Sequence, residues 1–402
     1  MQLTSEDKLI LSSVKINPAS DDLERLNSLI PQIKDWDNLT TNIIDRGIGP
    51  LFYKKLPLLS NQELLPNEVK IKLQQAYYKT LSRSMVLYEA FQKVAKAFTS
   101  DGIQVVVLKG IYLSEWLYRD IALRQFSDMD LLVKPEDGEK CIAILKKMGF
   151  KPCDASVTEF IGSQTEIIHF APMVLNDVSV EIHIRLHRKS KNYEIQVSDF
   201  IKNAVPVTIN QVQVYALQLY DLLIHLCVHL DKHFRGGHIQ FTCFNDITNV
   251  LDIHADEIDW PTFTLRCREN KCENLVFSYL MLIHKYFNIR LPENIVQKYD
   301  SLLTKDDEIL FYEYLQGVFH KKYHVETHWQ NIRQIKGFGH KARYFWDLIF
   351  PPKKFMIQKY HIKNPSLYRF YYPYRYWIGM KGLFKLVVDS PAKAKCRSRH
   401  RE

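Results

Sequence analysis

The stretch LRQFSDMDLLV, residues 123–133, has the pattern of a hydrophobic strand but carries two carboxylates one residue apart. Because side chains alternate between the two faces of a strand, Asp128 and Asp130 point to the same face. Met129 and Leu131 point to the opposite face, which we expect to be buried. Two like charges side by side are unfavourable unless a positive group lies between them, and a divalent metal ion is such a group. The chain must therefore build a sheet that is apolar on one face and acidic on the other.

Strand and helix patterns alternate around this stretch. A β-branched run ends shortly before Gly110, a helical pattern begins there, and a second helical pattern follows the aspartate strand over residues 135–149. Two further β patterns, at residues 165–175 and 178–187, flank Asn176-Asp177, which predicts a β-hairpin. Helical periodicity fills residues 1–100 and returns from about residue 217.

We therefore predict an α+β protein with one central sheet and helical N- and C-terminal regions. The predicted division is a helical N-terminal region, a core that contains the sheet, a helical C-terminal domain and a basic aromatic tail, at residues 1–100, 101–210, 211–350 and 351–402.

The second strand of the hairpin presents polar groups on a single face. Val180 and Ile182 share one face, whereas Glu181 and His183 share the other. If this strand lies beside the aspartate strand, Glu181 joins the two aspartates. Three carboxylates on adjacent strands form an oxygen-rich site that suits Mg²⁺ with nucleotide phosphates. His183 either orients an acid, contacts phosphate or makes a structural hydrogen bond.

Groups that suit phosphate lie just before the acids. Gly110 lies at a strand-to-helix turn, where the backbone N–H groups of a helix start can bind an anion. Lys109 adds a positive charge there, or is a solvated residue at the strand end. Arg124 and Ser127, upstream of the aspartates, can reach the same phosphates.

These pieces resemble a known group of enzymes. The segments GIQVVVLKG, LRQFSDMDLLV and VEIHIRLH occur in the order found in the nucleotidyltransferase superfamily that includes DNA polymerase beta. Within it, the chain resembles the uncharacterised nucleotidyltransferase family of bacteria, up to about residue 255. The chain departs from the superfamily pattern at Lys109-Gly110, where Gly-Ser is usual.

The resemblance implies a polymerase-beta-like sheet and a two-metal transfer of a nucleoside monophosphate from NTP, with release of pyrophosphate. Asp128, Asp130 and Glu181 would be the catalytic and metal-binding acids, holding two Mg²⁺ ions, or Mn²⁺. Glu181 would also accept the proton of the acceptor. Lys109, Gly110, Arg124, Ser127 and His183 would bind the nucleotide. The acceptor is a small molecule, a peptide, a protein or an RNA end.

Two other functions fit the same residues. One is a non-catalytic member of the fold that binds nucleotide or a partner protein, and the other is a phosphoryl transferase. Replacing Asp128 or Asp130 with Asn separates a catalytic from a structural role. We expect either substitution to abolish turnover and to leave the fold stable or slightly stabilised, because repulsion between carboxylates is relieved.

A histidine stripe lies in the helical region that follows. His225, His229 and His233 recur every four residues in HLCVHLDKH, with Asp246 downstream. Histidines at this spacing can share a zinc ion. The more ordinary interpretation is a helix packed on the core, with its histidines hydrogen-bonded at the contact.

The charge of the chain is concentrated in its tail. Residues 351–402 contain 13 Lys and Arg but 2 acidic residues, whereas the remaining residues contain 41 and 43. Ten of those 52 tail residues are aromatic. Basic aromatic segments suit an anionic membrane surface, RNA or docking on the protein itself. The polar N-terminus and the scattered cysteines predict a cytoplasmic protein, and the tail suits peripheral contact at the inner membrane face.

Overall fold

The computed structural model describes residues 3–153, 168–187, 193–236 and 241–316, together with parts of 339–377. The chain forms two compact units. The first comprises residues 1–153, 168–234 and 238–318, and the second contains the tail. Residues 165–167 of the first predicted hairpin strand and residues 378–402 of the tail lie outside the described residues.

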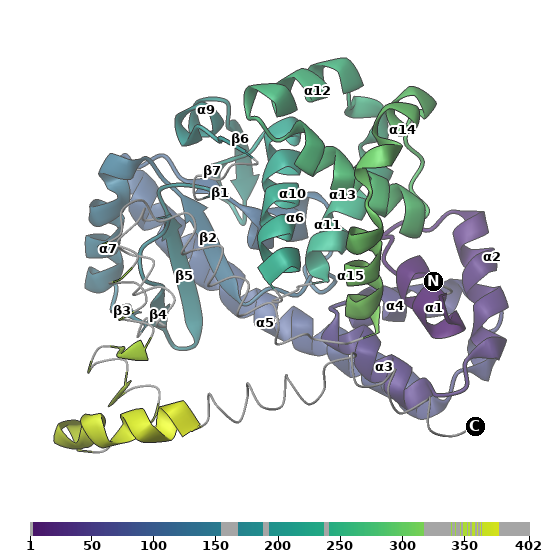
Figure 1. Ribbon diagram of the computed structural model, residues 1–402, viewed down its shortest axis with the longest axis horizontal. Coiled ribbons are helices and arrows are strands. Elements are labelled where there is room, and N and C mark those ends of the chain that lie inside the picture. The colour runs from purple at the N-terminus through teal and green to yellow at the C-terminus, as the bar shows by residue number, and fades with distance from the viewer. Residues whose placement is uncertain are drawn as a thin grey trace. The chain divides into compact units, whose positions relative to one another are not determined.

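A mixed sheet of seven strands organises the first unit, in the order β3-β4-β5-β2-β1-β7-β6 (Figure 1). Its strands in chain order are β1 (Val106–Val107), β2 (Asp128–Leu132), β3 (Lys151–Pro152), β4 (Met173–Leu175), β5 (Val178–His183), β6 (Val205–Ile209) and β7 (Val212–Ala216). The central strand β2 is parallel to β5 and antiparallel to β1. The sequence prediction that the aspartate strand lies beside the second hairpin strand is therefore confirmed.

Two hairpins of the sheet turn on residues with positive φ. In the predicted hairpin β4–β5, Asn176 and Asp177 have φ of 47° and 65°. Two-residue loops of this kind match the twist of the flanking strands, and Asn and Asp tolerate the conformation. A second hairpin, β6–β7, turns at Asn210 and Gln211 in the same way, with φ of 45° and 65°. We did not predict it, although the alternating pattern VPVTI and VQVYA was a signal for it.

The apolar face of the central strands is fully covered. Met129, Leu131, Val180 and Ile182 are at most 1% exposed. The helices α5 (Asn67–Ser100) and α7 (Gly138–Lys147) pack on the strands. Helix α5 has 34 residues, which at 1.5 Å per residue makes it about 50 Å long. It continues past the sheet to the remaining N-terminal helices, α1 (Ser5–Ser12), α2 (Ser20–Leu29), α3 (Trp36–Asp45) and α4 (Gly49–Lys55).

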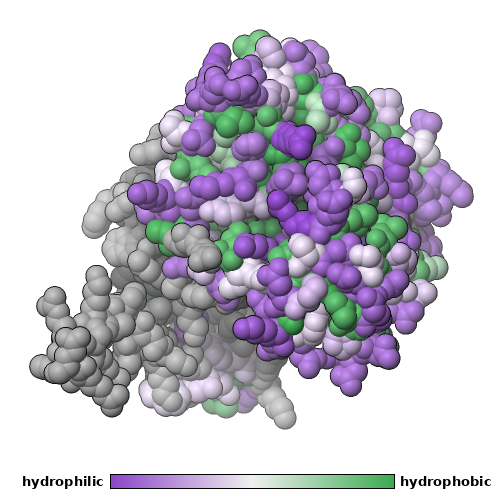
Figure 2. Space-filling model, turned by 90° about the vertical axis from the view of Figure 1, so that its right-hand side faces the viewer, coloured by the Kyte–Doolittle hydropathy of each residue, from purple (hydrophilic) through white to green (hydrophobic). Residues whose placement is uncertain are grey.

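The other helices follow the sequence prediction, apart from a short helix before β6 that we did not predict. Helix α6 (Lys109–Trp116) connects β1 to the segment before β2, and α9 (Val197–Lys202) precedes β6. In its described part, the helical region after the sheet contains α10 (Leu219–Gly236), α11 (Thr242–Ile253), α12 (Trp260–Glu269), α13 (Glu273–Tyr286), α14 (Glu293–Tyr299) and α15 (Lys305–Leu315). Among the described residues, none of the helices is long and apolar enough to span a bilayer. Figure 2 shows a helical face on which hydrophilic side chains predominate, with smaller apolar patches between them.

Lys55 is an unusual feature of the N-terminal helices. Its side chain is buried, and its ammonium donates to the carbonyl oxygens of Ser13 and Leu51 at 3.0 and 3.2 Å. Burial lowers the pKa of Lys55 to about 7, and the nearby charge of Asp22 opposes this shift only in part. The unfolded chain therefore binds a proton between about pH 7 and 10.5 that the folded chain does not, so stability rises with pH across that window.

We expect Lys55→Met to remove this pH dependence. Between pH 7 and pH 9.5, the free energy of unfolding of the wild type should rise by about 3 kcal/mol relative to that of the variant. Urea denaturation at the two pH values measures the difference. Lys79→Met is the matched control, because Lys79 is exposed on α5. Parallel pH profiles for the wild type and Lys55→Met would contradict the prediction.

Candidate active site

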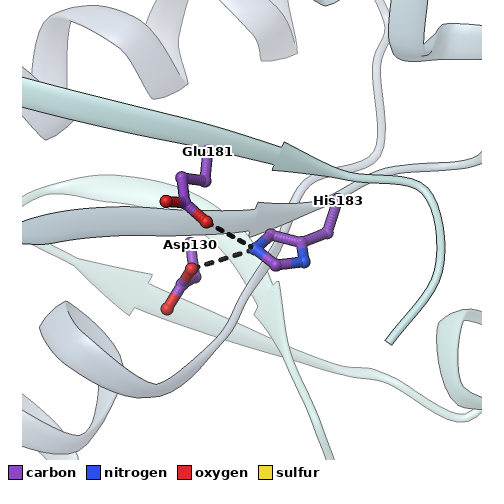
Figure 3. Close-up of side chains that lie close together, drawn as sticks. All are labelled: Asp130, Glu181 and His183. Atoms are coloured by element: carbon purple, nitrogen blue, oxygen red, sulfur yellow. Dashed lines mark hydrogen bonds and ion pairs between the residues drawn. The ribbon is translucent and has the colours of Figure 1, made fainter. Parts of the chain in front are cut away.

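Three potential metal-binding side chains meet on the acidic face of the sheet. The register of β2 and β5 places Asp130 directly opposite Glu181. His183 Nε2 lies 2.9 Å from Asp130 Oδ1 and 3.6 Å from Glu181 Oε2, so that the imidazole points between the two carboxylates (Figure 3). One ligand atom from each of the three residues lies within 4.8 Å of the others. Within the described part of the chain, no other group of His, Cys, Asp or Glu meets this condition.

The charge of Asp130 is strongly stabilised. Burial by itself would raise the pKa of its carboxyl, but Lys109 and His183 hold that pKa well below the usual range. Lys109 Nζ lies 3.1 Å from Asp130 Oδ2, on the oxygen that His183 does not use. Burial likewise opposes the charge of His183, yet its bonds to Asp130 and Glu181 raise its pKa. The pKa of Glu181 is lowered by His183 against the effect of burial.

Asp128 differs from its neighbour on the strand. It lies on the same face as Asp130 but outside the group of three, at the start of β2 and opposite Ser179. Burial, and next the charge of Asp130, raise the pKa of Asp128 to about 6. The pKa of Asp128 is therefore raised while that of Asp130 is lowered. The symmetric Asp-x-Asp pattern does not reveal this difference.

The turn at Lys109-Gly110 lies against the aspartate strand. The N–H of Leu108 donates to the carbonyl oxygen of Asp130 at 3.0 Å, and α6 begins at the next residue. A Cβ on Gly110 would lie 3.1 Å from the ring of Phe126 and 3.4 Å from the carbonyl oxygen of Asp128. The absence of a side chain at Gly110 allows the helix start to approach β2, which brings Lys109 to the acids.

Arg124 does not lie free beside the acids. Its Nε and Nη2 donate to the two carboxylate oxygens of Asp246 at 2.9 and 2.7 Å, and the hydroxyl of Tyr118 donates to the same carboxylate. Arg124 and Asp246 are both buried. The guanidinium is thus engaged in joining the segment before β2 to α11, and its contact with phosphate stays a prediction.

Ser127 also has a different neighbour from the one expected. The residue is exposed, and its carbonyl oxygen accepts from Arg83 Nη2 at 3.0 Å. The same Arg83 atom donates to the carbonyl oxygen of Asp177 at 2.8 Å. Arg83 therefore joins α5 to the start of β2 and to the turn of the β4–β5 hairpin. Sequence reasoning missed this residue, since nothing in its local pattern distinguishes it.

The histidine stripe of α10 lies at the contact with the core, as the more ordinary interpretation predicted. His229 Nε2 lies 3.1 Å from Lys109 Nζ, and His225 Nδ1 lies 3.2 Å from His187 Nε2. Burial, and next the charge of Lys109, lower the pKa of His225 to about 3 and that of His229 well below its usual value. Both imidazoles are therefore neutral near pH 7.

An Asp-x-Asp strand beside a parallel strand with a third acid, and a glycine turn packed on the first strand, define the class of nucleotidyltransferase folds. The family model described as an uncharacterised nucleotidyltransferase matches residues 32–288. Since this span is more than half of the 402 residues, the chain belongs to that family. The matched region contains the whole sheet, every candidate site residue, and α10 and α11. The comparison with curated proteins finds no match.

Proposed function

We propose that this protein transfers a nucleoside monophosphate from an NTP to an acceptor hydroxyl and releases pyrophosphate. The observation that carries the proposal is the pairing of Asp130 with Glu181 across two parallel strands, in a chain of the nucleotidyltransferase family. Lys109 contacts Asp130, and Gly110 lies against the backbone of Asp128. Both residues suit phosphate, which supports the proposal further.

The residues present fit a divalent metal. Carboxylate oxygens are the ligands that suit Mg²⁺ and Mn²⁺, whereas the added imidazole nitrogen is a ligand type more usual for other first-row metals such as iron and zinc. Asp130, Glu181 and His183 would hold the ion, with Asp128 beside them. A metal bound there would supply positive charge to the phosphates and make the acceptor hydroxyl more acidic.

Groups of the protein itself would accept the proton of the acceptor and orient the phosphates during the transfer. The acceptor oxygen forms a bond to the α-phosphorus while the bond from that phosphorus to the bridging oxygen breaks, and pyrophosphate leaves. The acceptor proton passes to Glu181, the carboxylate on β5. Lys109 and the backbone at Gly110 orient the phosphates, which reduces the entropy that the transfer must otherwise lose.

Position-specific labels test this proposal. Purified protein with Mg²⁺ or Mn²⁺ and each NTP, with and without cell extract, should move label from the α-phosphate to a product and release pyrophosphate. Movement of a γ-phosphate label instead would identify a phosphoryl transferase. NTP binding without transfer of either label would favour a non-catalytic member of the fold.

We also propose that the tail, residues 351–402, contacts an anionic membrane surface. In its described part, Phe370, Tyr374 and Trp377 are 76%, 50% and 52% exposed. The hydroxyl of Tyr372 donates to the carbonyl oxygen of Pro351 in the tail, and that of Tyr376 donates to the carbonyl oxygen of Ile349, just before the tail. These two rings are therefore held against nearby backbone. Exposed aromatic rings suit the headgroup region, and the excess of Lys and Arg suits anionic lipid.

Liposome flotation tests the contact with lipid. We expect the protein to float with anionic but not neutral vesicles, and to lose binding between low and high salt, because each basic residue contributes roughly 1 kcal/mol within a Debye length. Phe370→Ser with Trp377→Ser should weaken flotation, whereas Leu64→Ser, an exposed apolar position in the N-terminal helices, should not. Binding to RNA but not to vesicles would contradict the membrane role.

A further inference from the structure

Lys109 occupies an unusual position among the acids. It is the first residue of α6, and its side chain is 14% exposed although it carries a charge. A buried ammonium is unfavourable unless it is paired and hydrogen-bonded. Its Nζ lies 3.1 Å from Asp130 Oδ2 on one side and 3.1 Å from His229 Nε2 on the other.

His229 acts as a support for this ammonium. The pKa of His229 lies well below its usual value because of burial and the charge of Lys109, so the ring is neutral and can accept a hydrogen bond. The ring of His233 lies next to that of His229, with centroids 4.3 Å apart, which limits its movement. The ammonium of Lys109 is thus held by two contacts, one with His229 on α10 and one with Asp130 on β2.

Asp130 connects two cation positions. Its Oδ2 contacts Lys109, while its Oδ1 faces His183 Nε2, within the group that also contains Glu181. In two-metal sites the ions lie roughly 3.5–4 Å apart and share a carboxylate. Here Asp130 has the place of the shared carboxylate, and the position on one of its sides is already filled by an ammonium.

The balance of charge in the site also favours one divalent ion beside Lys109. Asp128, Asp130 and Glu181 carry three negative charges when all are ionised. The ammonium of Lys109 and one divalent cation together balance them. A second divalent ion on Oδ2 would lie against the ammonium of Lys109, and two like charges this close are unfavourable.

We propose that Lys109 is a built-in cation that replaces the second metal ion, so that the site takes one divalent ion, held by Asp130, Glu181 and His183. This inference rests on the proposed function, and it replaces the two-ion arrangement that the family resemblance implies. Lys109 then serves as a fixed positive charge beside the metal.

Counting bound Mn²⁺ on the 402-residue chain tests the proposal. Equilibrium dialysis should find one ion per wild-type chain, and the electron paramagnetic resonance spectrum should be that of an isolated ion. Lys109→Met and Lys109→Gln free Asp130 Oδ2, so each should bind two ions and give the spectrum of a coupled pair. Lys109→Arg keeps the charge and should bind one ion. Circular dichroism melting shows whether each variant is folded.

The possible results separate this inference from the proposed function. Two ions on the wild type would overturn the role of Lys109 whether or not any variant folds, and would leave the nucleotidyl transfer proposal intact. One ion on the wild type and still one on both folded neutral variants would also overturn it. No binding by the wild type would contradict the metal site itself, and the proposed function with it.

Discussion

Asp130→Asn is expected to lower the rate of nucleotidyl transfer by about 10³-fold or more, since metal-assisted charge stabilisation contributes several kcal/mol to such reactions. The substitution removes the charge that faces both Lys109 and His183. It should also lower the free energy of unfolding of the metal-free protein by roughly 1.5–3 kcal/mol, because a charged hydrogen bond to Lys109 is lost. This differs from the expectation based on carboxylate repulsion alone, in which either aspartate could be neutralised without cost.

Asp128→Asn is the matched control, with the opposite effect on stability. The pKa of Asp128 is raised to about 6 in the folded protein, from 3.8, so the folded chain binds a proton between these values that the unfolded chain has lost. Stability therefore falls as pH rises through this window and stays reduced above it. At pH 8 and with chelator present, the variant should be more stable than the wild type by about 1–3 kcal/mol. Urea denaturation measures both variants. Equal changes in the free energy of unfolding for Asp128→Asn and Asp130→Asn would contradict the expected opposite effects of the two substitutions.

Arg124→Ala is expected to destabilise the protein by about 3–5 kcal/mol, because it leaves the carboxylate of Asp246 buried without its partner. Urea denaturation measures this loss. The double variant Arg124→Met with Asp246→Leu removes both charges and should recover most of the stability, which a double-mutant cycle quantifies. The competing prediction, that Arg124 binds phosphate, requires weaker NTP affinity in this variant. A loss of NTP affinity with unchanged stability would be the opposite pattern. That pattern would exclude the structural role.

Local sequence pattern was enough to predict the strands of the site and their acidic face. Alternation in residues 128–132 and 178–183 placed Asp128, Asp130, Glu181 and His183 on the correct faces, because the two-residue period of a strand is a local property. The hairpin at Asn176-Asp177 was also predictable, since positive φ favours these residue types. The hairpin β6–β7 was readable in the same way, but we did not predict it.

The contacts of the charged side chains, in contrast, could not be predicted from local pattern. Arg124 pairs with Asp246 across 122 residues, and Lys109 meets His229 across 120. Such pairings depend on how α10 and α11 pack on the sheet, which periodicity does not encode. The different pKa values of Asp128 and Asp130 have the same origin, because only the fold places Lys109 and His183 on one of two aspartates that look equivalent in the sequence.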